Sequence, residues 1–260
     1  MKITNGKSVH VVGVSQLPVQ KKSDLSIQEM GARVVRKALD DAGLLTADAL
    51  FVGNMLSGLL SQQQQLAAII GNASPIRGKE AFTIEAACGS GGAALRAGMM
   101  AIKSGFCDTV VVCGIEKMFH ENKEQVTKAI ATASDFETEF DQGENFLTLN
   151  ARLAKLYLDT YRLPSDAFMM FGINAHSNAQ KNPNALFQKI ISTADYREAK
   201  LISGPLRIFD ASPVCDGAAA VVLSKFSATE LKGISDSTVK ITGSGCATEQ
   251  VGLSKRFKPT

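Results

Sequence analysis

Short apolar runs alternate with amphipathic segments along the first 116 residues of the chain. The runs are rich in β-branched residues and bounded by polar or glycine positions, which predicts buried strands. These runs span residues 9–14, 49–55, 80–87 and 109–114. Helical patterns lie between them, so the order is β-α-β-α-β-α-β. This alternation predicts a mostly parallel sheet with helices covering its faces.

Two of the expected helices carry recognisable end signals. Ser26 to Glu29 has the form S-x-x-E, which is typical of a capping box at a helix start. Gly43 suits the C-terminal cap of the same helix. The second helix is expected over QQQQLAAIIG, residues 62–71, with Gly71 closing it.

The character of the chain changes after Glu116. Residues 117–205 are more polar, which predicts an inserted and mostly helical subdomain. Two helices are expected in it, over 149–161 and 165–180, the second capped by Ser165.

The strand pattern then resumes, and it defines the expected domains. Strands are predicted over 217–224 and 239–245, with a short helix between them. The expected domains are an N-terminal half (1–116 plus 206–236), an inserted loop domain (117–205) and the start of a further half (237–260).

Composition and charge narrow the class of protein. The chain is 45% hydrophobic and 20% charged, which suits a globular protein with a sizeable core. A net charge of +3, scattered basic residues and no Trp argue against a nucleic-acid partner. No run approaches the roughly 18 apolar residues of a membrane span, and no signal peptide is recognised. The five cysteines lie far apart in the sequence, which favours a reducing cytoplasm over a disulfide framework. None of the three histidines lies near a cysteine or an acidic cluster in the sequence, so no metal site is predicted.

Cys88 is the most informative position, because it ends an apolar run and stands directly before a glycine-rich helix. One interpretation is a structural cysteine, since free Cys often behaves as a small buried hydrophobe. The same interpretation fits Cys107, Cys113 and Cys246. The helix that follows, residues 89–104, carries few charges and is predicted to be buried on nearly all sides.

A second interpretation is a dinucleotide-binding turn. Gly89-x-Gly91-x-x-Ala94 has the spacing of that fingerprint, with Glu116 as the acid that would bind the ribose. The context argues against it, because two β-α units precede the turn and Glu116 follows a glycine.

A third interpretation makes Cys88 a nucleophile. At a helix N-terminus the unpaired N–H groups and the helix dipole favour an anion, so a thiol there ionises more readily. The glycines let a substrate approach the backbone, and the Cys88 N–H can donate to a developing oxyanion. Such a site suits transfer of an acyl group between thiols.

Several segments resemble the thiolase superfamily, most closely the sterol-carrier-protein-type and archaeal-type thiolases. They are EAACGSGGAALRAGMMAIKSGFCDTVVVCGIEKM, NAHSNAQKNPNALFQK, PLRIFDASPVCDGAAAVVLS and ITGSGCATEQVGLSKR. The first is similar to the nucleophile segment of the family. The third is similar to its Asp-x-Ser-Pro-x-Ser-Asp-Gly-Ala-Ala signature, with Cys215 where Ser is usual. The resemblance favours the nucleophile interpretation of Cys88.

The resemblance implies an α/β thiolase fold, with two α-β-α-β-α layered halves and an inserted loop domain that helps to bind coenzyme A. It implies acyl transfer between coenzyme A and Cys88, coupled to Claisen condensation or thiolytic cleavage of a 3-oxoacyl-CoA in lipid metabolism. The substrate is a coenzyme A thioester, and no covalently bound cofactor is expected. Relatives form dimers or tetramers, with the sheet edge near the Cys segment in the dimer interface.

The family continues well over a hundred residues beyond the equivalent of Thr260, and the blocks that carry its activating histidine and second acid/base group are not found here. None of His10, His120 and His176 is assigned as the general base. We therefore expect a chain that is incomplete alone, truncated after the first strand of the second half. It is expected to be a fragment of an ordinary thiolase, with a truncated gene or completion by a second chain as the alternatives. The apolar helix face around Ala93, Ala97 and Met100 is then expected to be uncovered.

Other interpretations stay open. The main alternative is a non-catalytic scaffold subunit with a thiolase fold, completed by a partner chain. A ketoacyl-synthase relative fits the Asp-x-Ser-Pro block and the long insert less well. A nicotinamide-dependent dehydrogenase predicts cofactor binding that survives Cys88→Ala.

Asp210 and Asp216 are expected to hold their loop through side-chain to backbone hydrogen bonds, and Cys215 is expected to be structural.

Overall fold

A computed structural model describes residues 8–232 and 239–256 of the chain, which divides into two compact units. Unit 1 contains residues 1–119 and 215–246, and unit 2 contains residues 120–214 and 247–260. The domain boundary expected between 236 and 237 lies outside the described residues.

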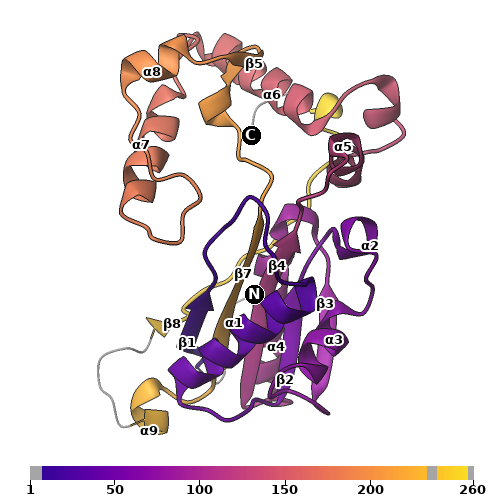
Figure 1. Cartoon of the computed structure of the whole chain (residues 1–260), viewed down its shortest axis with the longest axis vertical. Helices are drawn as coiled ribbons and strands as arrows, with labels where there is room; N and C mark the ends of the chain where they lie inside the picture. The colour runs from indigo at the N-terminus through magenta and orange to yellow at the C-terminus, as the bar shows by residue number, and fades with distance from the viewer. Residues whose placement is uncertain (1–7, 233–238, 257–260) are drawn as a thin grey trace. The chain divides into compact units, whose positions relative to one another are not determined.

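The described part of unit 1 is built on a six-stranded sheet with the order β3-β2-β4-β7-β1-β8 (Figure 1). Its strands are β1 (His10–Gln16), β2 (Ala49–Gly53), β3 (Glu80–Ile84), β4 (Thr109–Lys117), β7 (Asp216–Ser224) and β8 (Val239–Lys240). β3, β2 and β4 pair in parallel, whereas β7 pairs antiparallel with β4 and β1, and β8 pairs antiparallel with β1. β1 to β4 therefore share one direction, as predicted, but β7 and β8 run the opposite way. The last strand, predicted over 239–245, is shorter in the structure, where β8 ends at Lys240.

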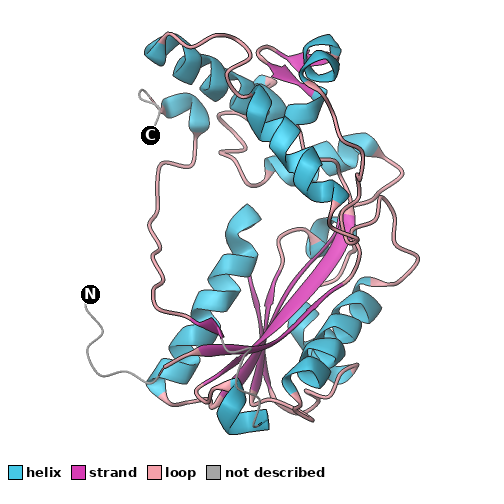
Figure 2. Ribbon diagram, turned by 90° about the vertical axis from the view of Figure 1, so that its left-hand side faces the viewer, coloured by secondary structure: helices cyan, strands magenta, loops and turns pink. Residues whose placement is uncertain are grey.

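Helices cover both faces of this sheet (Figure 2). α1 (Ile27–Ala42) and α3 (Leu66–Asn72) pack on one face, against side chains such as Leu50 and Val111. α4 (Ser90–Ser104) packs on the other face, against Phe51 and Val112. Neighbouring residues of β2 and β4 thus point to opposite faces, as the pleat of a strand requires. Unit 1 also contains α2 (Ser57–Leu60), α9 (Ala228–Lys232) and the 3₁₀ turn η1 (Ala87–Gly89).

The predicted ends of α1 are confirmed. The Ser26 side chain accepts from the Glu29 N–H, and the Glu29 carboxylate accepts from the Ser26 N–H, which completes the capping box. Gly43 caps the other end in the left-handed region, with φ of 66°. The helix predicted over 62–71 begins later, at Leu66, because Gln65 has φ of 52° and lies outside the helical region. It also continues one residue past Gly71 and ends at Asn72.

Unit 2 is mainly helical, as the sequence predicts for this segment. Its elements are α5 (Lys123–Ala131), η2 (Phe140–Gln142), α6 (Phe146–Tyr161), α7 (Met169–Gln180), α8 (Thr193–Glu198), β5 (Leu201–Ser203), β6 (Leu206–Arg207), η3 (Ile208–Asp210) and η4 (Leu253–Lys255). Asn145 caps α6 through a capping box, so the helix begins at Phe146, three residues before its predicted start at 149. Ser165 does not cap α7, because residues 165–168 form turns first. Across the described residues, no helix combines the length and apolarity needed to span a membrane.

Candidate active site

Cys88 lies in the turn η1, between the edge strand β3 and α4, and its side chain is exposed. The predicted strand-to-helix position is therefore confirmed. Ala87, the residue before it, has φ of 48°. This left-handed conformation is uncommon for a residue with a Cβ atom, and it makes the turn sharp.

Ser90 holds this turn from the inside. Its buried hydroxyl accepts from the Ala86 N–H at 2.9 Å and donates to the Ala87 carbonyl at 2.6 Å. The Glu85 carboxylate accepts from the Ala87 N–H at 2.5 Å. The peptide groups that precede Cys88 are thus fixed by two side chains.

The glycines of the turn leave open space in front of it. A Cβ atom placed on Gly89, Gly91 or Gly92 would meet nothing within 4 Å. No side chain caps the start of α4, where N–H groups have no partner within the helix. The turn therefore offers a substrate an approach to both the thiol and the backbone.

Glu116 lies near the end of β4, on the face of the sheet that carries α4, because it follows Val112 and Gly114 in strand alternation. Its Oε1 accepts from the Met55 N–H at 2.5 Å and the Leu56 N–H at 3.2 Å. Its Oε2 is buried with no hydrogen-bond partner among the described residues. Burial raises the pKa of this carboxyl, against the opposing effect of the two N–H donors. Because the carboxylate binds the protein's own backbone, it gives no support to the ribose-binding role.

Asp216, at the start of β7, anchors the loop that follows β1. Its side chain is buried, with 1% of the residue exposed. Oδ2 accepts from the Ser23 N–H at 2.9 Å, and Oδ1 accepts from the Phe119 N–H at 2.8 Å. The Lys117 ammonium lies 3.6 Å from Oδ2 and donates to the Ser23 carbonyl. Asp216 thus forms side-chain to backbone hydrogen bonds, as predicted, but they hold the segments at Ser23 and Phe119 and not its own loop.

The other cysteines differ in exposure. Cys107 and Cys113 are buried, as the structural interpretation predicts, and burial raises the pKa of the Cys113 thiol to about 12. Cys215 is partly buried, and burial, followed by the neighbouring Asp216, raises the pKa of its thiol. Cys246 is exposed, because it lies in an irregular segment after β8, so the structural interpretation does not describe it.

The three histidines have separate surroundings. His10 pairs with Ser224 at the amino end of β1, whereas Cys88 follows the carboxyl end of β3, which runs in the same direction. In unit 2, His120 Nδ1 accepts from the Asn122 N–H, and His176 Nδ1 lies 2.8 Å from the Lys189 carbonyl. Residues 8–232 and 239–256 contain no cluster of three or more His, Cys, Asp or Glu that could hold a metal ion.

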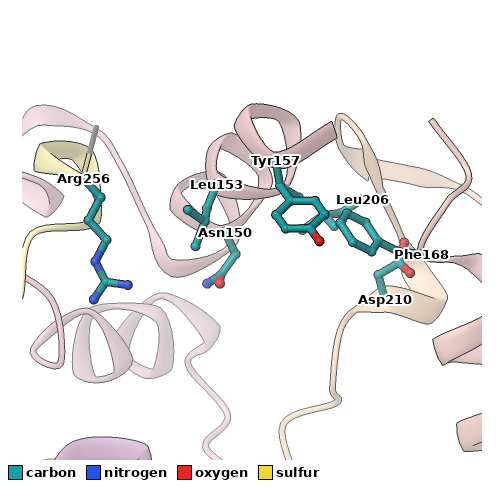
Figure 3. Close-up of a pocket in the computed structure, with 8 residues that line it drawn as sticks. Asn150, Leu153, Tyr157, Phe168, Leu206, Asp210 and Arg256 are labelled. Atoms are coloured by element: carbon teal, nitrogen blue, oxygen red, sulfur yellow. The ribbon is translucent and has the colours of Figure 1, made fainter. Parts of the chain in front are cut away.

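Unit 2 contains a pocket of about 410 Å³, which the sequence did not reveal (Figure 3). The lining residues are Asn150, Leu153, Ala154, Tyr157, Phe168, Leu206, Asp210 and Arg256. The rings of Tyr157 and Phe168 lie 5.8 Å apart. Asp210 accepts from the Tyr196 hydroxyl at 2.8 Å and the Arg207 N–H at 2.7 Å, so its predicted loop-holding role is confirmed. No local pattern marks this pocket, because its members come from separate segments.

The sequence matches the family model "Thiolase, N-terminal domain" over residues 9–227. It is 36% identical over 252 residues to the acetyl-CoA acetyltransferase of Methanothermobacter thermautotrophicus, an alignment that covers 96% of this chain and 65% of that protein. The chain thus spans slightly less than two thirds of the length of this relative.

Solved structures share the fold. The Ltp2-ChsH2(DUF35) aldolase matches with a TM-score of 0.77 and 19% identity, covering 98% of this chain and 66% of that one. Human mitochondrial 3-ketoacyl-CoA thiolase in complex with CoA matches with a TM-score of 0.67 and 16% identity, covering 84% and 64%. The α/β thiolase fold expected from the resemblance is confirmed. The match from residue 9 to residue 227, together with the archaeal relative, establishes that this chain belongs to the thiolase family.

Proposed function

We propose that this chain carries the nucleophile of a thiolase-type acyltransferase, and that the nucleophile is Cys88. The observation that carries the proposal is the exposed thiol on a fixed strand-to-helix turn with open space in front. The buried Cys107 and Cys113 lack such access. The relative named as an acetyl-CoA acetyltransferase supports the same chemistry.

In the proposed step, the Cys88 thiolate attacks the carbonyl carbon of an acyl-CoA thioester. The negative oxygen of the tetrahedral intermediate accepts hydrogen bonds from backbone N–H groups at the turn, that of Cys88 among them. The new carbon–sulfur bond forms, the bond to coenzyme A breaks, and the coenzyme A sulfur takes up the proton that Cys88 lost. One thioester replaces another, so the exchange is nearly neutral in free energy. In Claisen condensation, the carbanion of a second acyl-CoA would then attack the acyl group on Cys88, so that a carbon–carbon bond forms and the Cys88 thiolate leaves. In thiolytic cleavage, Cys88 would instead attack the 3-oxo carbon of a 3-oxoacyl-CoA, the bond between carbons 2 and 3 would break with protonation of the leaving acyl-CoA carbanion, and coenzyme A would take the acyl group from Cys88.

Unit 2 is the proposed binding region for part of coenzyme A. Its pocket is lined by the rings of Tyr157 and Phe168 and, at the other end, by Arg256, whose guanidinium also donates to the Gln250 carbonyl and lies 3.8 Å from the Glu249 carboxylate (Figure 3). Aromatic rings can stack on a purine, and a guanidinium can bind phosphate. Arg256→Ala is expected to weaken binding of coenzyme A more than binding of its dephospho form, which isothermal titration would measure.

The exposed edge of the sheet at β3 leads us to propose that the protein forms a homodimer or homotetramer. β3, the strand that leads to Cys88, is the edge strand on this side of the described sheet, and Phe82 on it is 54% exposed. Unpaired strand edges readily pair with another chain. A DUF35-type protein is a further proposed partner, since one is named with the aldolase of the same fold. A cytoplasmic location and a role in lipid metabolism belong to the same proposal.

The alternative is a non-catalytic scaffold subunit that a partner chain completes. On the α4 face expected to be uncovered, Met100 is 59% exposed, whereas Ala93 and Ala97 are half-buried and Ala97 packs against the core. The expectation therefore holds for Met100 only, and a partner chain that covers Met100 is compatible with this alternative. A scaffold subunit would present the same face but would never acylate Cys88.

Intact-mass measurement of the natural protein with acetyl-CoA tests the proposal. We expect one acetyl group per chain, absent in Cys88→Ala and retained in Cys246→Ala, whose cysteine is also exposed. No acetyl group in the unmodified sequence, with or without added partner proteins, would favour the scaffold alternative. Acetylation that survives Cys88→Ala would assign the nucleophile elsewhere.

A further inference from the structure

Gly53, the last residue of β2, lies directly beneath the start of α4. A Cβ atom on Gly53 would lie 2.5 Å from the Ser90 carbonyl oxygen and 2.7 Å from the Gly91 Cα. Both neighbours are backbone atoms, so no side chain can rotate out of the way. The absence of a side chain at Gly53 is therefore what allows the turn to rest on the strand.

Gly114 provides an internal comparison, because it is the register partner of Gly53 on β4. A Cβ atom on Gly114 would lie 4.0 Å from the Gly91 Cα, which is ordinary van der Waals contact. The two glycines occupy equivalent positions on neighbouring strands, yet only Gly53 is required by close approach. The close contact is thus specific to β2.

The strand end around Gly53 is itself rigidly held. The next residue, Asn54, donates its backbone N–H to the Ile84 carbonyl at 3.2 Å and its side-chain amide to the Ile115 carbonyl at 2.8 Å. It also accepts from the Ser57 N–H at 2.9 Å. These bonds connect the ends of β2, β3 and β4. A rigid strand end transmits a displacement to the turn instead of absorbing it.

We propose that Gly53 is a positioning residue for Cys88, which fixes the depth at which the turn sits on the sheet. Together with the Ser90 hydroxyl, it sets where the thiol and the nearby N–H groups meet the carbonyl of an acyl thioester. This inference rests on the proposed function, because it takes Cys88 as the acyl acceptor.

The size of the effect follows from the contact distances. Ordinary contact begins near 3.4 Å, so an alanine at 53 forces the Ser90 carbonyl to retreat by about 1 Å. A misplacement of about 1 Å in a reacting group can lower the rate about 100-fold. An exposed thiol in the same turn should still react with a small reagent that needs no particular geometry.

The test compares Gly53→Ala with its matched control Gly114→Ala in the natural protein. Mass spectrometry would follow acylation of Cys88 by acetyl-CoA, alkylation of Cys88 by iodoacetamide, and labelling of the buried Cys113 as a measure of unfolding. For Gly53→Ala we expect acylation to fall about 100-fold, with alkylation and Cys113 labelling close to those of the unmodified sequence. For Gly114→Ala we expect all three rates to stay close to the unmodified ones.

A second variant keeps the test decisive if Gly53→Ala does not fold. Ser90→Ala removes the hydroxyl that bridges Ala86 and Ala87 and adds no atoms, and it should lower acylation about tenfold with alkylation retained.

Equal acylation rates for Gly53→Ala and Gly114→Ala in folded protein would overturn the inference and leave the proposed function intact. A parallel loss of alkylation would also overturn it, since access and not geometry would then have changed. Absence of acylation in the unmodified sequence would instead refute the proposed function.

Discussion

Replacing the buried Asp216 by asparagine should lower the stability of unit 1. The carboxylate binds two backbone N–H groups from segments far apart in the chain, Ser23 and Phe119. Asparagine keeps one acceptor oxygen and places an NH₂ group where the other oxygen stood. One of the two N–H groups then faces a donor.

The magnitude follows from these contacts. Losing a hydrogen bond to a charged acceptor costs about 1.5–3 kcal/mol, and a buried N–H left without a partner adds to that cost. Lys117, whose side chain is 25% exposed, loses its carboxylate at 3.6 Å but keeps its bonds to the Ser23 and Leu25 carbonyls. We expect Asp216→Asn to lower the free energy of unfolding of unit 1 by about 3 kcal/mol, at the lower end of the range for breaking a buried ion pair.

Labelling of Cys113 provides the assay. This thiol is fully buried in β4, and burial raises its pKa to about 12, so it reacts only when the unit opens. Cys113 pairs in register with Ala220 of β7, the strand that begins at Asp216. Each 1.4 kcal/mol is a factor of ten, so a loss of about 3 kcal/mol should speed native-state labelling about 100-fold.

Asp108→Asn is the matched control in the same unit. Asp108 forms an ion pair with Lys225 at 2.6 Å, but the carboxylate is 48% exposed, and such pairs contribute less than about 1 kcal/mol. Its labelling rate should therefore rise less than about fivefold. If Asp216→Asn labels Cys113 no faster than Asp108→Asn does, the reasoning about the buried carboxylate is wrong.

Three further variants test other features. Burial raises the pKa of Glu116, so the folded chain keeps that proton to higher pH than the unfolded chain. The free energy of unfolding therefore falls as the pH rises from about 4.5 through the pKa of Glu116 in the folded chain. Urea unfolding of unit 1 at a series of pH values should show a smaller fall in Glu116→Gln. Tyr196→Phe removes the hydroxyl that donates to Asp210 and should lower the free energy of unfolding of unit 2 by about 1–3 kcal/mol. Faster hydrogen exchange over residues 193–210 would measure this loss. Phe82→Glu places a charge on the exposed edge strand and should shift sedimentation toward monomer.

Each of these expectations has a contrary outcome. An unchanged pH slope in Glu116→Gln would mean that the Glu116 proton is not linked to folding. Unchanged hydrogen exchange over residues 193–210 in Tyr196→Phe would mean that the hydrogen bond from Tyr196 to Asp210 does not stabilise unit 2. A Phe82→Glu variant with the same oligomeric state as the unmodified chain would place the subunit interface away from β3.

Local signals were sufficient to predict much of the fold. The capping box at Ser26 and the glycine at 43 define α1, and the apolar runs locate β1, β2, β3 and β4. These signals depend on neighbours within a few residues. The direction of β7 was not predictable, because an apolar run indicates a strand but not its partner. At Ser165 the sequence predicted a helix start that the structure does not have, because α7 begins at Met169 and Ser165 does not cap it.

The candidate site was predictable only in part. The position of Cys88 between a strand and a helix is recognisable, because the sequence displays both elements. The role of Gly53 depends on Ser90 and Gly91, which come close only when the sheet forms. The binding of Glu116 to the backbone of Met55 and Leu56 likewise depends on the pairing of β2 with β4. Interactions across more than thirty residues leave no local pattern.

The position of β7 between β4 and β1 also constrains the order of folding. β1 pairs only with β7 and β8 in the described sheet, so β1 has no strand partner there until residues 216–224 are synthesised. The β4–β7 junction joins Phe119 to Asp216, which are 97 residues apart. Closing so long a flexible loop costs conformational entropy, and this cost is lower if the residues between β4 and β7 have already folded as unit 2. The rate at which β7 completes the sheet would then depend on the rate at which unit 2 folds.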